Sequence, residues 1–198
     1  MAITSIKTGS SFTNLVKYND FLGPNSAYIP PSYESIASAT GTGSSTTITF
    51  SSIPSTYAHL QLRILGRADA AATGGSITVY ANNDTTGTNY ARHRLSSDGT
   101  TVTATGAAST ATQLGRVSAA SAPANIMGVT IIDIHDYIST TKNKTFRSFS
   151  GRDQNGAGDL WLTSGLWLST SAINRIDLVL GSNWTTQTSI ALYGIKGA

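Results

Sequence analysis

The chain has 198 residues, 12% of them charged, and a formal net charge of +3. Its length suits one large domain, or one domain with an appendage, and allows a core that needs no covalent cross-links. It contains no cysteine, which excludes disulfides and thiolate metal sites. The first residues lack the apolar stretch of a signal peptide, and no apolar run approaches the roughly 18 residues of a membrane span, so we expect no membrane partner.

The composition favours β-structure. Glu, Lys and Arg usually line the wet face of long helices and are scarce here, whereas Thr, Ser, Gly and Ala are abundant. Thr, Val, Ile and aromatic residues fit pleated strands. The basic residues are scattered and form no Lys/Arg block, so we expect no nucleic-acid partner.

Residues 1–31 differ from the rest of the chain, because Gly and Pro residues there separate single apolar anchors. A disordered tail usually carries fewer apolar groups. We therefore predict an extended N-terminal arm that docks on its own domain or, as we favour, tethers the chain to a neighbouring subunit. The Pro30-Pro31 step favours extended backbone and marks the boundary with a domain over 32–198. The expected docking residues are Phe12, Leu15, Tyr18, Phe21 and Tyr28.

From residue 32 onward, short strand-like segments alternate with turn residues. In 59–65, Leu60, Leu62 and Ile64 are expected on one face and the polar residues between them on the other. Asn, Asp and Gly residues mark turns at 82–87 and 96–99. In this half we predict strands over 33–39, 46–50, 59–65, 76–81, 89–95, 101–105 and 113–118.

The second half has the same organisation. Residues 125–137 are the most apolar and predict a central strand covered on both faces, because the β-branched residues and Gly128 argue against a helix. Further strands are predicted over 144–150, 159–169, 175–180 and 189–195. The segment 159–169 divides into two faces, with Leu160, Leu162, Leu166 and Leu168 on one and Trp161, Thr163 and Trp167 on the other.

Roughly ten short strands without intervening helices indicate a sandwich or a barrel and exclude parallel βαβ units. We predict an all-β, antiparallel β-sandwich, jelly-roll-like, with the N-terminal arm attached. No fixed period recurs, so a β-solenoid is set aside.

The histidines offer little catalytic chemistry. His59, His93 and His135 show none of the spacings of a metal site, and we expect no metal. His135 lies between Asp133 and Asp136, and a carboxylate on the same strand face could orient it as a general base. The alternative is a polar cluster at the end of a strand.

Two other polar segments allow chemistry but have simpler explanations. Asp153 and Asp159 flank a glycine-rich loop and could face one another as the carboxylates of a polysaccharide hydrolase. The oxygen-rich turn 82–87 could hold Ca²⁺. Asp is common in turns for backbone reasons alone, which accounts for both segments.

The tryptophans suggest a binding face. Trp161 and Trp167 lie on one side of a strand, where they could stack sugar rings or instead fill the sandwich core. Tyr80 and Tyr90 could pair across the hairpin around the turn 82–87. The residues of the glycan-binding alternative are Trp161, Trp167, Asn83, Asp84 and Asp153.

Several stretches within 33–198 carry a family resemblance: 51–63, 89–95, 141–151, 164–168, 173–178 and 191–198. The most specific is the ending Leu192-Tyr193-Gly194-Ile195-Lys196. These stretches resemble a family of small virion-associated proteins of tailed phages. The resemblance implies a β-sandwich module of the capsid or tail surface, located in the virion, and no catalytic residues.

The sequence therefore predicts a non-enzymatic virion structural protein, a capsid- or tail-associated module of decoration or fibre type, without a cofactor. Its expected partners are other virion proteins and copies of itself in a symmetric oligomer, for example a trimer. The alternative is a receptor- or glycan-binding module of a tail or head fibre that attaches to a host-surface glycan. A hydrolase is the third class.

Overall fold

The computed structural model describes residues 32–108 and 112–197, in which twelve strands follow one another. The larger sheet contains β1 (Tyr33–Thr40), β12 (Ser189–Ile195), β3 (His59–Gly66), β8 (Gly128–Ile134), β9 (Lys144–Asp153), β10 (Gly158–Trp167), β5 (Tyr90–Ser97) and β6 (Val102–Ala108). The smaller sheet contains β2 (Thr47–Phe50), β11 (Ile176–Val179), β4 (Gly74–Ala81) and β7 (Thr112–Ser118).

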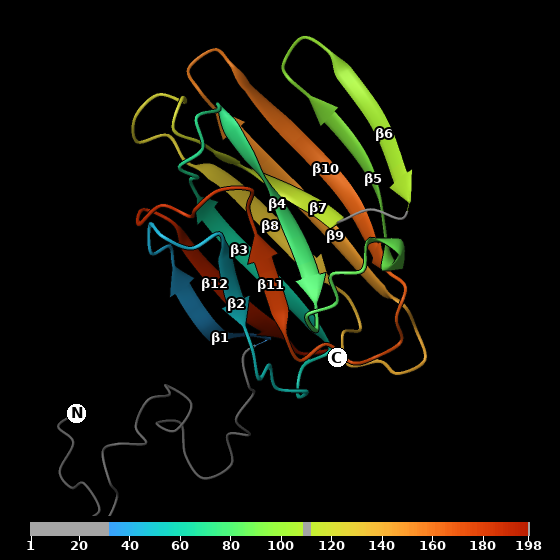
Figure 1. Ribbon diagram of the computed structural model, residues 1–198. Helices are drawn as coiled ribbons and strands as arrows, with labels where there is room; N and C mark the ends of the chain where they lie inside the picture. The colour runs from blue at the N-terminus through green and yellow to red at the C-terminus, as the bar shows by residue number, and fades with distance from the viewer. Residues whose placement is uncertain (1–31, 109–111, 198) are drawn as a thin grey trace, which may run out of the picture. The chain divides into compact units, whose positions relative to one another are not determined.

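The two sheets are antiparallel and pack face to face, which confirms the predicted all-β sandwich. Figure 1 shows the four-stranded sheet lying over one side of the eight-stranded sheet. The helical turn η3 (Gly87–Asn89) precedes β5. No helix within the described ranges is long and apolar enough to cross a membrane. The arm over residues 1–31, with its five anchors, lies outside the described residues.

Eight of the strands follow a jelly-roll order. In the larger sheet β1, β12, β3 and β8 are successive neighbours, and β2, β11, β4 and β7 make up the smaller sheet. The chain crosses between the sheets from β1 to β2, β2 to β3, β3 to β4, β4 to β5, β6 to β7, β7 to β8, β10 to β11 and β11 to β12. The remaining strands are two hairpins, β5–β6 and β9–β10, and their strands continue the larger sheet beyond β8. We call the four hairpin strands the extension.

The core lies between the sheets. As predicted, Leu60, Leu62 and Ile64 of β3 share the buried face, where they meet apolar residues of the smaller sheet such as Leu178. Burial of these side chains supplies most of the folding free energy, at about 25 cal/mol per Å² of apolar surface. Because the chain contains no cysteine, this burial stabilises the fold without disulfides.

Two expectations need correction. The strand predicted over 125–137 with both faces covered is shorter, Gly128–Ile134, and only one face is covered, since Val129 remains 50% exposed. The chain then turns at Asp136, whose φ of 48° is in the left-handed region. Tyr80 and Tyr90 do contact one another, with centroids 5.8 Å apart, but they lie on different sheets and join them rather than pairing within one hairpin.

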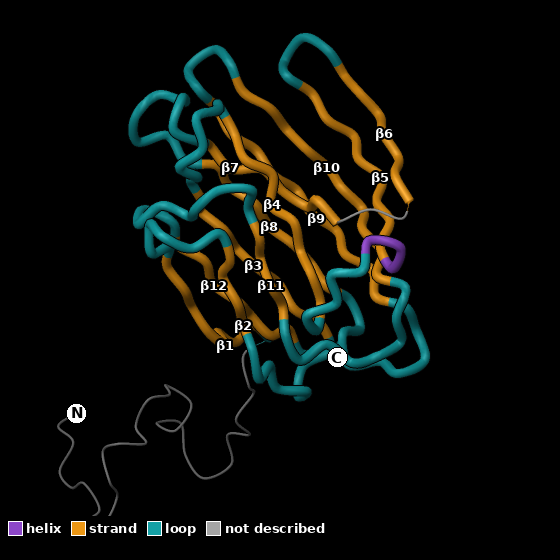
Figure 2. The backbone as a smooth tube through the Cα atoms, in the orientation of Figure 1, coloured by secondary structure: helices purple, strands orange, loops and turns teal. Residues whose placement is uncertain are grey.

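The extension reaches past the edge of the smaller sheet. β7 is the edge strand of that sheet and packs on β8, β9 and β10, with fewer contacts to β5. Figure 2 shows β5 and β6 continuing beyond the strands that cover the rest of the sheet. The outer face of the extension and the inner face of β5 and β6 are therefore places where side chains can meet a partner.

Candidate binding faces of the extended sheet

The outer face of the eight-stranded sheet, which points away from the smaller sheet, carries large apolar side chains. On β9, and on β10 from Leu160 onward, more exposed residues alternate with buried ones, because successive side chains point to opposite faces. Phe149 is 55% exposed, Leu160 52% and Leu162 49%. Such large groups are costly to leave in water, and a contiguous set of them marks an interaction surface.

Strand register makes these residues contiguous. Leu162 of β10 lies opposite Phe149 of β9 on one side and Leu95 of β5 on the other. Phe149 in turn lies opposite Ile131 of β8, and cross-strand neighbours of this kind have Cβ atoms about 5 Å apart. We call the following set the apolar patch: Leu65, Leu95, Val102, Val129, Ile131, Phe149, Leu160 and Leu162.

A shallow hollow of about 630 Å³ lies at one end of the apolar patch. Val129, Gly151 and Leu160 line it together with the turns of the two inserted hairpins, at 98–99 and 153–158. A side chain at Gly151 would contact Leu160, so the glycine keeps this part of the sheet surface low. The hollow could receive an apolar side chain of a partner.

Polar residues border the apolar patch on the same face. Asp133 accepts a hydrogen bond from Gln61 at 2.8 Å and pairs with Arg147 at 3.3 Å. Asp133 and Arg147 lie opposite one another, two residues along their strands from Ile131 and Phe149. The outer face thus has an uncharged part and a polar border, the arrangement usual at protein interfaces.

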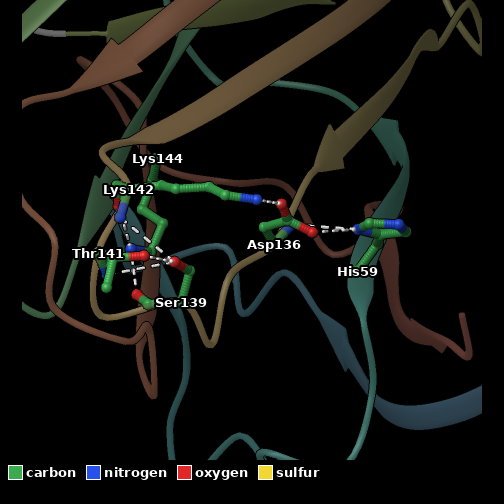
Figure 3. A network of polar contacts seen from close by, with 6 residues as sticks. All are labelled: His59, Asp136, Ser139, Thr141, Lys142 and Lys144. Atoms are coloured by element: carbon green, nitrogen blue, oxygen red, sulfur yellow. Dashed lines mark hydrogen bonds and ion pairs between the residues drawn. The ribbon is translucent and has the colours of Figure 1, made fainter.

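The histidine cluster has a structural explanation. Figure 3 shows Asp136 between His59 and Lys142. The backbone N–H of Asp136 donates to Nδ1 of His59 at 3.0 Å, and Lys142 Nζ lies 2.7 Å from the Asp136 carboxylate, lowering its pKa. His135 contacts the His59 ring edge-on at 5.1 Å, while Asp133 is engaged elsewhere. A pairing of Asp133 with His135, as a general base would need, is therefore absent from the contacts of the described residues, and the polar-cluster alternative fits.

The tryptophans are not exposed, so the alternative in which they fill the sandwich core fits and the sugar-stacking pair does not. Trp161 is 5% and Trp167 3% exposed, and both lie on the inner face of β10. The indole N–H of Trp167 donates to Asp84 at 2.8 Å, so that carboxylate points inward rather than to a sugar or Ca²⁺. Asn83 is exposed in the turn that follows β4, and Asp153 is exposed at the last position of β9.

The two candidate hydrolase carboxylates do not face one another. Asp159 lies on the inner face, 2.6 Å from Arg152 and 3.3 Å from Arg116. Asp153 belongs to the opposite, outer face, because it follows the buried Arg152 on β9, and it accepts the backbone N–H of Asn155. The opposition across the loop that a hydrolase would need is therefore absent between these two carboxylates. Within 32–108 and 112–197 no group of His, Asp and Glu could hold a metal ion.

Comparison of the chain with protein families, characterised proteins and solved structures finds no match. The apolar patch was present in the sequence as the leucine face of 159–169, but alternation alone does not tell which face is covered. Sequence reasoning missed the arginines around Trp161 altogether, because Arg94, Arg116 and Arg152 come from three different strands.

Proposed function

We propose that this chain is a non-enzymatic structural protein of a tailed-phage particle that assembles with neighbouring subunits through the apolar patch and through residues 1–31. The observation that carries the proposal is the contiguous set of exposed and partly exposed apolar side chains on the outer face of the larger sheet, most of them on the extension. The phage location rests on the resemblance of the stretches within 33–198, above all the ending at 192–196.

The physical support is the free energy of burying the apolar patch. Removing two or three such side chains from water on association contributes several kcal/mol, at roughly 1.5–3 kcal/mol for each side chain buried in full. The polar residues around the apolar patch determine the orientation of a bound partner more than they raise its affinity. The two hairpins that carry most of the apolar patch are insertions in the eight-strand jelly roll, so the fold itself does not require them.

The occupant we assign to the apolar patch is the arm of a neighbouring copy. Residues 1–31 carry apolar anchors separated by Gly, Pro and Ser and contain few charges, which matches the nearly uncharged centre of the outer face. An arm that binds a neighbour makes every subunit both donor and acceptor, which builds a symmetric oligomer and adds avidity on a particle.

Paired aspartate substitutions test the proposal. Leu162→Asp places a charge in the apolar patch, whereas Ser164→Asp places it on the same strand and face, opposite Arg147 and His93 in the polar border. By sedimentation velocity we expect the full chain and Ser164→Asp to associate, and Leu162→Asp and a chain lacking residues 1–31 to sediment as monomers. Equal association of the two aspartate variants, or association that survives loss of residues 1–31, overturns the assignment.

Assembly on particles tests the phage role separately. A phage lysate complemented with the tagged chain should yield particles that carry the chain, and particles should carry much less of Leu162→Asp than of Ser164→Asp. Normal incorporation of Leu162→Asp contradicts docking through the apolar patch. Particles without any of the tagged chain contradict the structural role itself.

A further inference from the structure

Arginines from three strands converge on the inner face of the extension, at the edge of the smaller sheet. Arg92 and Arg94 come from β5, Arg116 from β7 and Arg152 from β9. Arg92 is tied to β7 by a hydrogen bond of 2.8 Å to Gln113. Burial lowers the pKa of Arg94, and the charges of Arg92 and Arg116 lower it further. The guanidinium groups of Arg92 and Arg116 therefore repel that of Arg94.

A polar hollow of about 330 Å³ opens between this cluster and the turns of the hairpins. Trp161 lines it, together with residues that carry hydroxyl groups on β5 and β6. The charged residues in its lining are Asp98, Arg116, Arg152 and Asp159.

The guanidinium groups in this region differ in how well they are neutralised. Arg152 has only 6% of its side chain exposed and is bound to Asp159 through two contacts, at 2.6 and 2.8 Å. Arg94 stacks on the Trp161 ring, 3.8 Å from its centroid, and its buried Nε has no hydrogen-bond partner among the described residues. Arg116 lies 5.2 Å from the same centroid, and its Nε contacts Asp159 at 3.3 Å without a hydrogen bond.

The second carboxylate at the hollow does not neutralise these arginines. Asp98 turns its Oδ1 into its own hairpin turn, where it accepts the backbone N–H groups of Thr100 and Thr101 at 2.9 and 2.7 Å. These hydrogen bonds bring the pKa of Asp98 to about 2. Positive charge therefore exceeds negative charge in this region, although Oδ1 of Asp159 also has no hydrogen-bond partner among the described residues.

We propose that Arg116, which lines the hollow, and Arg94, which stacks on the Trp161 ring next to it, bind an oxyanion: the carboxylate, sulfate or phosphate group of a ligand that enters the hollow. A guanidinium stacked on an indole keeps its edge N–H groups in a planar fork that suits such a group. The hydroxyls of Ser96 and Thr103, which also line the hollow, suit the hydroxyls of an acidic sugar. The site is on the opposite face of the sheet from the apolar patch and goes beyond the assembly role.

Calorimetric titration of the full chain tests the site. The probes are inorganic phosphate and a galacturonic acid trisaccharide, with neutral maltotriose as the control ligand. We expect saturable binding of an anionic probe that weakens with added salt, and roughly tenfold weaker binding in Arg94→Gln, the effect of one lost charge-assisted hydrogen bond. Arg147→Gln removes the same charge from a side chain that is 63% exposed on the outer face and should leave binding unchanged.

The outcomes separate the sources of the anion. Binding of the trisaccharide alone indicates an acidic saccharide, and binding of phosphate as well indicates that the oxyanion itself is recognised. Binding of neither probe, equal binding of maltotriose, or equal loss in Arg94→Gln and Arg147→Gln overturns the proposal. If thermal melting shows that Arg94→Gln is unfolded, Arg116→Gln replaces it, because Arg116 lines the hollow and its Nε has no hydrogen-bond partner among the described residues.

Discussion

The indole N–H of Trp167 donates a hydrogen bond to Oδ2 of Asp84 at 2.8 Å, which joins β10 to the turn after β4. The same carboxylate accepts the side-chain amide of Asn89 at 2.8 Å and the backbone N–H of Thr86 at 3.0 Å. The hydroxyl of Tyr90 donates to the backbone carbonyl of Asp84 at 2.8 Å. Asp84 thus connects the two sheets at the point where the β5–β6 insertion begins.

Asp84→Asn should lower the free energy of unfolding by about 2 kcal/mol, because an amide replaces a charged acceptor of several hydrogen bonds. Urea denaturation monitored by fluorescence measures the change. Asp153→Asn is the matched control, since its exposed carboxylate accepts only a turn N–H, and it should change the free energy by less than about 0.5 kcal/mol. Equal effects of the two substitutions would contradict the role assigned to Asp84.

The same carboxylate predicts an acid-sensitive step in stability. Burial raises the pKa of Asp84, but hydrogen bonds from Trp167, Asn89 and Thr86 outweigh it and bring the pKa to about 2. The unfolded value is about 3.9, so this stabilisation is complete above roughly pH 4 and is lost as the pH falls toward 2. The stability difference between the native chain and Asp84→Asn should therefore shrink from pH 5 to pH 2, and a constant difference would refute the shift.

Lys144 should be one of the most sensitive positions in the domain. It is 1% exposed, and its Nζ donates to the carbonyls of Ser139, Lys142 and Thr170 at 2.7, 2.8 and 3.1 Å. Lys144→Met keeps the stem but leaves these carbonyls without a donor, which should cost about 3 kcal/mol of unfolding free energy. Lys142→Met, at a side chain 66% exposed, should cost less than about 1 kcal/mol. Chemical denaturation of both variants compares them directly.

The glycine of the C-terminal Leu-Tyr-Gly-Ile-Lys stretch has a packing role. A Cβ at Gly194 would overlap the ring of Tyr57, whose hydroxyl donates to Glu34 at 2.9 Å. Gly194→Ala should displace that ring and lower the unfolding free energy by about 2 kcal/mol. Gly181→Ala is the control, because a Cβ there meets nothing within 4 Å. A melting temperature that is the same in both variants would show that Tyr57 moves aside without cost.

Most strands could be predicted from alternation and turn residues, because side chains on a strand repeat with period two whatever surrounds them. The turn predicted at Asp98-Gly99 is the connection between β5 and β6, and Asp98 accepts turn N–H groups as its residue type favours. The candidate sites were less predictable. Trp167 and Asp84 meet over a long sequence separation, and no local pattern reports such a contact.

The amino-acid sequence by itself determined the all-β class, the two faces of each strand and the dependence on packing rather than on disulfides. Only the tertiary structure decided that the face of Trp161 is buried and the face of Leu162 is exposed. The physical reason is that alternation divides a strand into two faces, whereas burial depends on whether a second layer covers one of them. Here the smaller sheet covers the inner face, so the leucines remain outside and the arginines gather at its edge.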